Sequence, residues 1–158
     1  MGTVAIPPFE TFYAEHNSEV LVFNALAFVP GSPTEVDLGA FDAALSANVT
    51  GALACVQEVV PAMREAGRGT ILLTGGGMAL QPVAGLAAVG VAKAAQRSLF
   101  QSLASELGPD GIHVGMVTVQ GLVKAGGPFD PALIADAHFT LHAQRRDAWE
   151  AEVFFDGT

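Results

Sequence analysis

Basic residues are scarce in this sequence. It has seven Lys and Arg residues against sixteen Asp and Glu, and none of the seven comes before Arg64. Nucleic acid backbones and anionic lipid headgroups are bound by clusters of basic side chains, and a chain with a formal charge of −9 offers no such cluster. We therefore expect neither a nucleic acid nor a membrane surface as a partner.

The chain has a single cysteine, Cys55, which excludes a disulfide within one copy. This residue lies in the run Ala-Leu-Ala-Cys-Val, which favours a buried, unreactive thiol over a nucleophile. The first residues show no basic segment followed by an apolar run and a small-residue cleavage site. The sequence therefore predicts a cytoplasmic protein.

Charged residues of both signs make up only 15% of the 158 residues, whereas 51% are hydrophobic and the mean hydropathy is +0.43. This composition excludes a disordered chain, and the length fits one globular domain. Much apolar surface has to be buried, either in the core or between copies of the chain.

The uncharged stretch from Gly69 to Ala92 is central to the pattern. It begins with the apolar run Thr70–Leu73, breaks at Thr74 and the glycines that follow, and continues into a helix of small residues that carries Lys93. A buried strand, a glycine break and a helix in this order predict an open α/β sheet, which binds ligands at the carboxyl ends of its strands. Three successive glycines and Pro82 argue against a membrane span here.

Hydrophobic periodicity predicts the other elements. Apolar residues three and four apart describe one helical face from Leu38 to Ala66, with Asp37 as N-cap and either one long helix or two with a bend near Thr50-Gly51. Further helices are expected over 85–107 and from Asp130-Pro131 to about 143, together with an anchoring helix near Trp149. Further strands are expected over 20–23, 112–119 and 153–155.

From Gly69 to Arg97 the sequence resembles the second half of a short-chain dehydrogenase/reductase, and the resemblance runs from about Ser18 to Val123. The family pairs a Ser at the end of this strand with a Tyr-x-x-x-Lys motif on the next helix, the Ser thirteen residues before the Tyr. Counting back from Lys93 places the Tyr position at Val89 and the Ser position at Gly76. The resemblance therefore implies a degenerate active site without its two reactive hydroxyls.

Other landmarks of the family are kept in part. Asn24 matches the family's Asn-Asn-Ala-Gly strand end, in which Phe23 and Leu26 replace the first Asn and the Gly. Asn48, in Asn-Val-Thr-Gly, matches the mid-helix Asn that holds a proton-relay water, and Gly121 keeps half of a Pro-Gly pair. The resemblance thus implies catalytic remnants at Lys93 and Asn48 and cofactor contacts at Asn24, Thr74, Lys93 and Gly121.

The family's nucleotide-binding half begins with a TGxxxGxG turn, which the residues before Glu19 do not contain. The resemblance therefore implies a truncated, Rossmann-like three-layer α/β domain over 19–158, with a small parallel sheet of three or four strands, after an irregular segment over 1–18. The edge of strand 20–23 would then be bare, and we expect Thr3–Ile6, a second copy or another protein to pair with it.

Three side chains leave alternatives open. Lys93 can bind an anion or lie half-buried with its ammonium reaching water, and we favour the second. Thr74 can orient a ligand or hydrogen-bond its own loop, and again we favour the second. Tyr13 carries the one phenol of the chain and is expected to be a packed aromatic.

The histidines do not form a recognisable metal set. His138 and His142 are four residues apart on one expected helix, which is a chelating spacing, but no third ligand and no HExxH arrangement accompany them. His113 is interpreted as a surface residue of its strand. We predict no metal site.

Three functions follow, in order of preference. The first is a dehydrogenase-like domain without hydride transfer or a cofactor, because no phenol near Lys93 can move a proton. Such a domain would bind a hydrophobic small molecule, form a homodimer through the helices over 38–66 and 85–107, or pair with a full-length relative. The second is an NAD(P)-dependent oxidoreductase acting on a hydrophobic alcohol or carbonyl compound. The third is a non-redox enzyme that reuses the pocket between Asn24, Thr74, Lys93 and Gly121.

Overall fold

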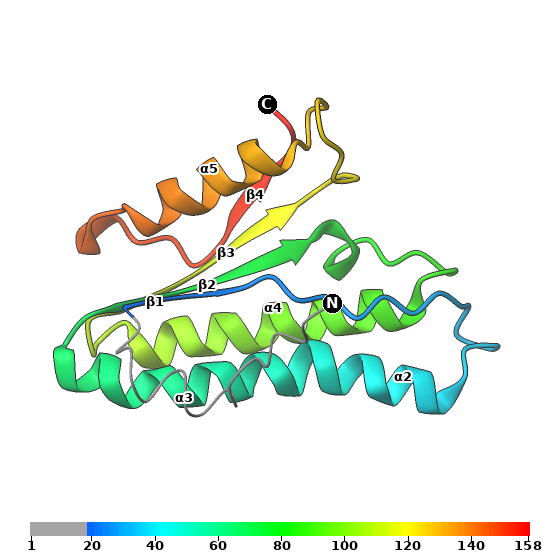
Figure 1. Cartoon of the computed structure of the whole chain (residues 1–158), viewed down its shortest axis with the longest axis horizontal. Coiled ribbons are helices and arrows are strands. Elements are labelled where there is room, and N and C mark those ends of the chain that lie inside the picture. Colours follow the sequence, from blue (N-terminus) through cyan, green and yellow to red (C-terminus); the bar gives the residue numbers. More distant parts are fainter. Residues whose placement is uncertain (1–18) are drawn as a thin grey trace, which may run out of the picture.

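The computed structural model describes residues 19–158 and places one parallel sheet between two layers of helices (Figure 1). The strand order is β1-β2-β3-β4, and every neighbouring pair is parallel. The strands are β1 (Val20–Phe23), β2 (Gly69–Gly76), β3 (Ile112–Val119) and β4 (Val153–Phe155). The expected small parallel sheet of a Rossmann-like α/β fold is confirmed, whereas Tyr13, Thr3–Ile6 and the rest of 1–18 lie outside the described residues.

One face of the sheet is covered by α2 (Leu38–Leu45), the π-helical η1 (Ser46–Thr50), α3 (Gly51–Ala66) and α4 (Ala87–Leu107) (Figure 1). The first three form one continuous helix, so the single long helix is confirmed and the expected bend is a π segment. Asp37 caps its start by accepting a hydrogen bond from the Ala40 amide. Gly67 ends it with a φ of 64°, a conformation that favours glycine.

The opposite face is covered by α5 (Pro131–His142), which begins where expected because Asp130 accepts a hydrogen bond from the Ala132 amide and Pro131 opens the first turn. Successive side chains of a strand point to opposite faces of the sheet, so each strand contributes apolar residues to the packing on both faces. Residues such as Phe23, Ile71, Leu73, Val114 and Met116 pack with α3 and α4, whereas Leu72, Val117 and Val119 pack with α5. Burial on both faces explains why the strands are almost continuously apolar.

The glycine run does not break the central strand where expected. β2 continues through Gly76 because its pairing with β3 continues to the Gly76 and Val119 pair. Gly75 fits inside the sheet, since a Cβ there would come within 2.7 Å of the Thr118 hydroxyl oxygen. The turn η2 (Gly77–Ala79) follows, and α4 begins at Ala87 rather than at Gly85.

The expectation for His113 is wrong. This residue is 2% exposed, its ring stacks on Trp149 with centroids 4.8 Å apart, and its Nε2 donates to the Glu150 carbonyl. The C-terminal segment around Trp149 crosses β3 and covers His113, a contact that sequence spacing could not indicate. This segment contains the short 3₁₀ turn η3 (Arg146–Ala148) in place of the expected anchoring helix. Burial lowers the pKa of His113 below its ordinary value.

The edge of β1 has no strand against it in the described part of the chain, where β1 pairs with β2 alone. Val20 and Val22 are 40% and 51% exposed there. Within residues 19–158, the helix Leu38–Ala66 is the one long and apolar enough to cross a membrane by length and composition. It packs on β1, β2 and α4.

Candidate functional site

A cavity of about 790 Å³ opens at the carboxyl ends of β1, β2 and β3. The residues that follow β1 and β3, the turn η2 and the side chain of Lys93 line it. All four expected cofactor contacts lie on its wall, namely Asn24, Thr74, Lys93 and Gly121. The rule that ligands bind at the carboxyl ends of parallel strands thus placed this cleft correctly from sequence.

Lys93 faces this cleft rather than bulk water. It is 8% exposed, and its Nζ donates a hydrogen bond to the Thr74 carbonyl oxygen at 2.7 Å. The expectation of an ammonium reaching water is wrong, because this side of α4 packs against the end of β2. Burial lowers the pKa of Lys93 to about 8, so its amine holds a proton less firmly than an ordinary lysine.

The two positions at which the family carries its reactive hydroxyls differ in their surroundings. Gly76 lines the cleft, and a Cβ built on it would lie 3.7 Å from the nearest Lys93 stem carbons, so a serine would fit there without a clash. Val89 lies in the first turns of α4 with no exposed surface, below Lys93 on the same helix. Its side chain has no group that can accept or donate a proton.

Thr74 does not bond its own loop, contrary to expectation. Its hydroxyl oxygen lies 3.2 Å from Nε2 of His138 on α5. The reason is that β2 continues past Thr74, which is therefore an interior strand position facing α5 rather than a strand end. Sequence reasoning missed this pair, since the two residues are 64 positions apart and no spacing rule connects them.

Asn48 lies away from the cleft wall and holds the loop after β1. Its side chain accepts from the Ala27 amide at 2.8 Å and donates to the Ala27 carbonyl at 3.0 Å. Its backbone carbonyl accepts a hydrogen bond from Gln96 Nε2 at 2.6 Å. The groups expected to hold a relay water are therefore bonded to the protein, and Asn48 acts on the cleft through the loop that it fixes.

Two further wall positions show how this cleft is shaped. Leu26 stands where the family motif has Gly, is 47% exposed, and presents an apolar side chain to the cleft. Gly121 backs onto the ring of Phe129, which a Cβ would overlap, so glycine is required there. The cleft is therefore more apolar on its β1 side than the resembled motif would make it.

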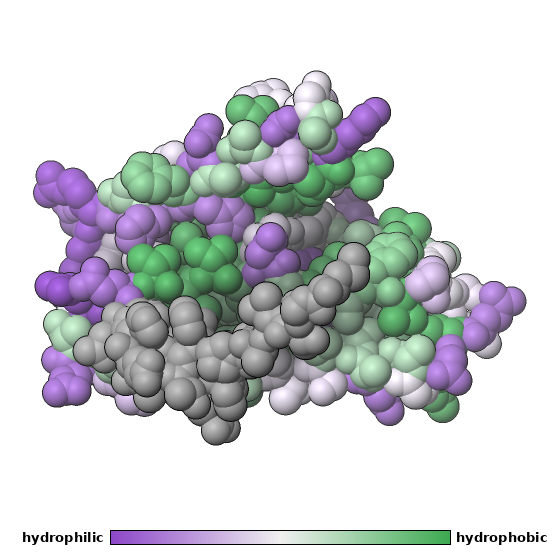
Figure 2. All heavy atoms as spheres, viewed as in Figure 1, coloured by the Kyte–Doolittle hydropathy of each residue, from purple (hydrophilic) through white to green (hydrophobic). Residues whose placement is uncertain are grey.

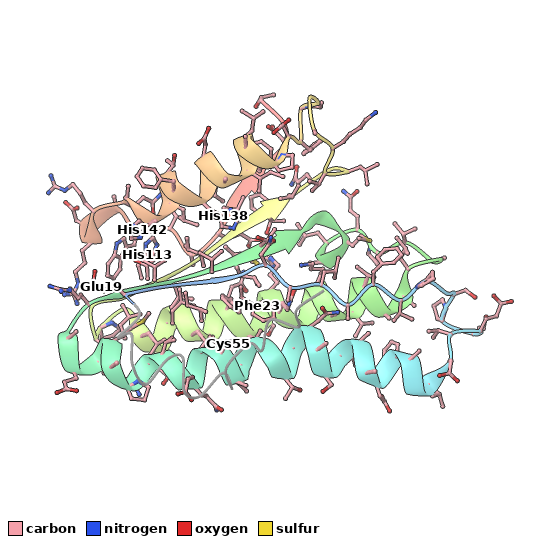
Figure 3. The ribbon with its side chains drawn as sticks, viewed as in Figure 1. Glu19, Phe23, Cys55, His113, His138 and His142 are labelled. Atoms are coloured by element: carbon pink, nitrogen blue, oxygen red, sulfur yellow. The ribbon has the colours of Figure 1, made fainter. Side chains whose placement is uncertain are left out.

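Neither the histidines nor the cysteine adds a metal or nucleophilic site to the cleft. Between residues 19 and 158 no group of three or more His, Cys, Asp and Glu side chains could hold a metal ion. Cys55 lies on α3 (Figure 3), packs against the core cluster between the helices and the sheet, and is half-buried rather than fully buried. Burial raises the pKa of its thiol, which disfavours the reactive thiolate.

A sequence model of the family described as short chain dehydrogenase matches residues 16–126. The chain belongs to the short-chain dehydrogenase/reductase family. Among curated members of this family, a 3-alpha-(or 20-beta)-hydroxysteroid dehydrogenase of Mycobacterium tuberculosis (strain ATCC 25618 / H37Rv) is 36% identical over 105 residues. That alignment covers 66% of this chain and 40% of the relative, so the chain spans less than half the length of this curated relative.

Solved structures of short-chain dehydrogenases/reductases superpose on most of this chain. A metagenomic short-chain oxidoreductase in complex with NADP is 28% identical, with a TM-score of 0.81 over 92% of this chain and 65% of that one. An oxidoreductase of the family from Burkholderia thailandensis is 27% identical, with a TM-score of 0.83 over 94% of this chain and 66% of that one. A solved relative of this fold therefore holds NADP.

Proposed function

We propose that this member of the short-chain dehydrogenase/reductase family binds a hydrophobic small molecule in the cleft and does not transfer hydride by the family's Ser-Tyr-Lys chemistry. The observation that carries the proposal is the buried Val89 at the Tyr position, beside Gly76 at the Ser position. A side chain without a titratable proton cannot act as general acid or base. Loss of that group alone typically lowers the rate by about 10² to 10⁴.

The cleft supports binding better than catalysis. Its wall combines apolar side chains such as Leu26, Leu80 and Leu122 with the single buried amine of Lys93. Such a wall suits an apolar molecule carrying one acceptor group, which Lys93 Nζ can reach in place of the Thr74 carbonyl. The residues of a dinucleotide-binding glycine turn do not occur in this sequence, so we propose that the chain by itself takes no NAD(P).

Calorimetric titration with NADH and NADPH tests the cofactor part of the proposal. We expect no binding at micromolar concentrations of either dinucleotide. Binding at micromolar affinity that is lost in Lys93→Ala would contradict it. The same protein, incubated with a panel of apolar alcohols and ketones and either dinucleotide, should show no change in absorbance at the nicotinamide wavelength.

Restoring the hydroxyl at the Ser position provides a further experiment. A serine at position 76 has room beside the Lys93 stem, whereas a tyrosine at position 89 must displace packed side chains. We expect Gly76→Ser to fold like the parent and to remain inactive. Turnover of a carbonyl compound by the unmodified chain, at a rate that Gly76→Ser does not change, would contradict the proposal that this chain does not transfer hydride.

A second candidate is an NAD(P)-dependent oxidoreductase acting on a hydrophobic alcohol or carbonyl compound. Two observations favour it: the NADP-bound relative of the same fold, and the lowered pKa of Lys93, whose amine could move a proton near neutral pH. Dinucleotide-dependent turnover that is abolished by Lys93→Met and retained in Thr74→Ser would establish this function. Absence of turnover in the unmodified chain would exclude it.

A further inference from the structure

A second cavity, which we call the α5 groove, lies between α5 and the exposed face of β1. Its volume is about 440 Å³, and most of its wall is apolar. Figure 2 shows hydrophobic side chains gathered below α5, over the position of β1. The apolar wall residues include Val20, Val22, Leu72, Val123, Ile134 and Phe139. Thr74 and Asn24 line this groove as well as the cleft at the strand ends.

The polar part of the wall has a fixed hydrogen-bond direction at Thr74. Nδ1 of His138 lies 3.0 Å from the Ile134 carbonyl oxygen, which can only accept. In the neutral imidazole Nδ1 is therefore the protonated nitrogen, and Nε2 is an acceptor. The Thr74 hydroxyl, 3.2 Å from Nε2, must then be the donor of their hydrogen bond.

With its proton committed to His138, the Thr74 oxygen can offer only its lone pairs to a ligand. The geometry points to a binding site in the α5 groove for an apolar molecule that carries one hydrogen-bond donor, which Thr74 Oγ1 accepts. A hydroxyl group fits this site, and a ketone of the same shape leaves the Thr74 oxygen facing another acceptor. This assignment goes beyond the proposed function, which concerns the cleft at the strand ends and the amine of Lys93.

The other polar wall groups do not set this preference. The amide of Asn24 offers both donors and acceptors, so it serves an alcohol and a ketone equally. His142 has its Nδ1 3.0 Å from the Thr70 hydroxyl, which can donate or accept, so its tautomer is not fixed by that contact. Figure 3 shows His138 and His142 between α5 and the sheet. Of their hydrogen bonds with threonines of β2, the one from Thr74 to His138 has an obligatory direction.

The Thr70 and His142 pair provides a matched control. It joins the same strand to the same helix, four residues earlier along β2 and four residues later along α5, through a hydrogen bond of similar length. Thr70 is 7% exposed and does not line the groove. Thr70→Val therefore removes an equivalent strand-to-helix hydrogen bond without substituting a residue that lines the groove, although it releases the wall residue His142 from its partner.

The experiment compares 4-tert-butylcyclohexanol with 4-tert-butylcyclohexanone as probes, by titration at pH 8.5 followed by amide and methyl NMR shifts. We expect shifts at Val20, Val22 and Ile134 and an affinity about 3- to 10-fold higher for the alcohol, the size of one hydrogen bond. The preference should disappear in Thr74→Val and persist in Thr74→Ser and Thr70→Val. A similar ketone affinity in Thr74→Val and the unmodified chain would show that the apolar wall is intact.

Three results would overturn the inference. The first is equal affinity of the two probes for the unmodified chain. The second is an alcohol preference that survives in Thr74→Val or disappears in Thr70→Val, since either would remove the assigned role from the Thr74 oxygen. The third is an absence of shifts at the groove, with the same methyl groups shifting on dilution, which would identify a second copy of the chain as the occupant.

Discussion

At the scale of single residues, Lys93 is the most buried of the Lys, Arg, Asp and Glu side chains in residues 19–158. It is a buried amine whose hydrogen-bond partner is a neutral carbonyl, with no carboxylate to compensate its charge. A buried cation of this kind opposes folding while it is protonated. The family resemblance placed this residue at the cleft, whereas its burial depended on how closely α4 approaches the end of β2.

The pH dependence of stability should report this burial. The Lys93 pKa falls from 10.5 in the unfolded chain to about 8 in the folded one, so the folded chain binds fewer protons between those pH values. The unfolding free energy should therefore rise by about 3 kcal/mol from pH 8 to pH 10.5 and stay level below pH 8. Lys93→Met should remove this rise, as measured by urea denaturation.

Both proteins should carry Cys55→Ala in this experiment. Burial raises the Cys55 pKa, so the thiol lowers stability as the pH rises through the same range. Parallel pH profiles for the two proteins would show that the amine of Lys93 titrates as it does in water.

At the scale of elements, side chains fix how a loop and an edge strand attach to the sheet. Asn48 and Gln96 join the π segment, the loop after β1 and α4, and Glu152 joins β4 to α4 and β3. Each connects segments 21 to 55 residues apart. The Asn48 attachment fixes the loop that forms the β1 side of the cleft, and none of these attachments could be derived from the periodicity of any one element.

Asn48→Ala should loosen the loop after β1. It removes both hydrogen bonds to Ala27 and leaves that amide and carbonyl without their partner. We expect a loss of about 2 to 3 kcal/mol in unfolding free energy, with faster hydrogen exchange at the Ala27 amide. Gln57→Ala, on the exposed side of α3, is the control and should change neither. Unchanged exchange at Ala27 in Asn48→Ala would contradict the assigned role.

Glu152→Gln should weaken the attachment of β4. Burial raises the pKa of this carboxyl, whereas hydrogen bonds from Arg97 and Thr118 lower it. The hydrogen bonds together outweigh burial, so the pKa lies below its ordinary value. Its stabilisation is therefore present at neutral pH and is lost as the pH falls through the folded pKa. We expect a loss of about 2 kcal/mol at pH 7 that shrinks as the pH falls through the folded pKa of Glu152, measured by urea denaturation.

Asp147→Asn is the matched control for Glu152→Gln. Its ion pair with Arg145 is exposed, with 69% and 85% of the side chains in water, so its removal should change stability by less than about 0.5 kcal/mol. Equal losses of unfolding free energy for the two substitutions would show that the buried position of Glu152 adds nothing to the stability.

At the scale of the whole molecule, apolar surface remains on two sides. Leu38, Val83 and Val91 are 77%, 51% and 46% exposed around the starts of α2 and α4, and Val20 and Val22 are exposed on β1. For a chain with a mean hydropathy of +0.43, surfaces of this kind favour association. We propose that the helical side, through 38–66 and 85–107, is the homodimer contact.

Light scattering on two single variants distinguishes these surfaces. We expect a dimer for the parent chain, a monomer for Val91→Lys on α4, and a dimer for Val22→Lys on β1, since a charge interrupts only the surface that is buried. If Val22→Lys is a monomer and Val91→Lys remains a dimer, the dimer contact lies at the edge of β1 instead. A monomeric parent chain would contradict the proposed dimer.

Much of the fold could be predicted from local patterns, and the errors have one physical cause. The strands over 20–23, 112–119 and 153–155, and the N-caps at Asp37 and Asp130, agree with the structure because apolar runs and capping side chains act within a few residues. The errors at β2 and His113 occurred where a distant segment decides. β3 extends the pairing of β2, and Trp149 covers His113.

The sequence by itself determined that this is a parallel α/β chain without hydroxyls at positions 76 and 89, because apolar runs and residue identity suffice for both statements, and its resemblance to the family placed Lys93 at the cleft. Tertiary structure alone decided that the amine of Lys93 is buried, that Asn48 holds Ala27 and that Thr74 meets His138. Each of those contacts joins elements far apart in the chain, and their docking depends on the packing of the whole core.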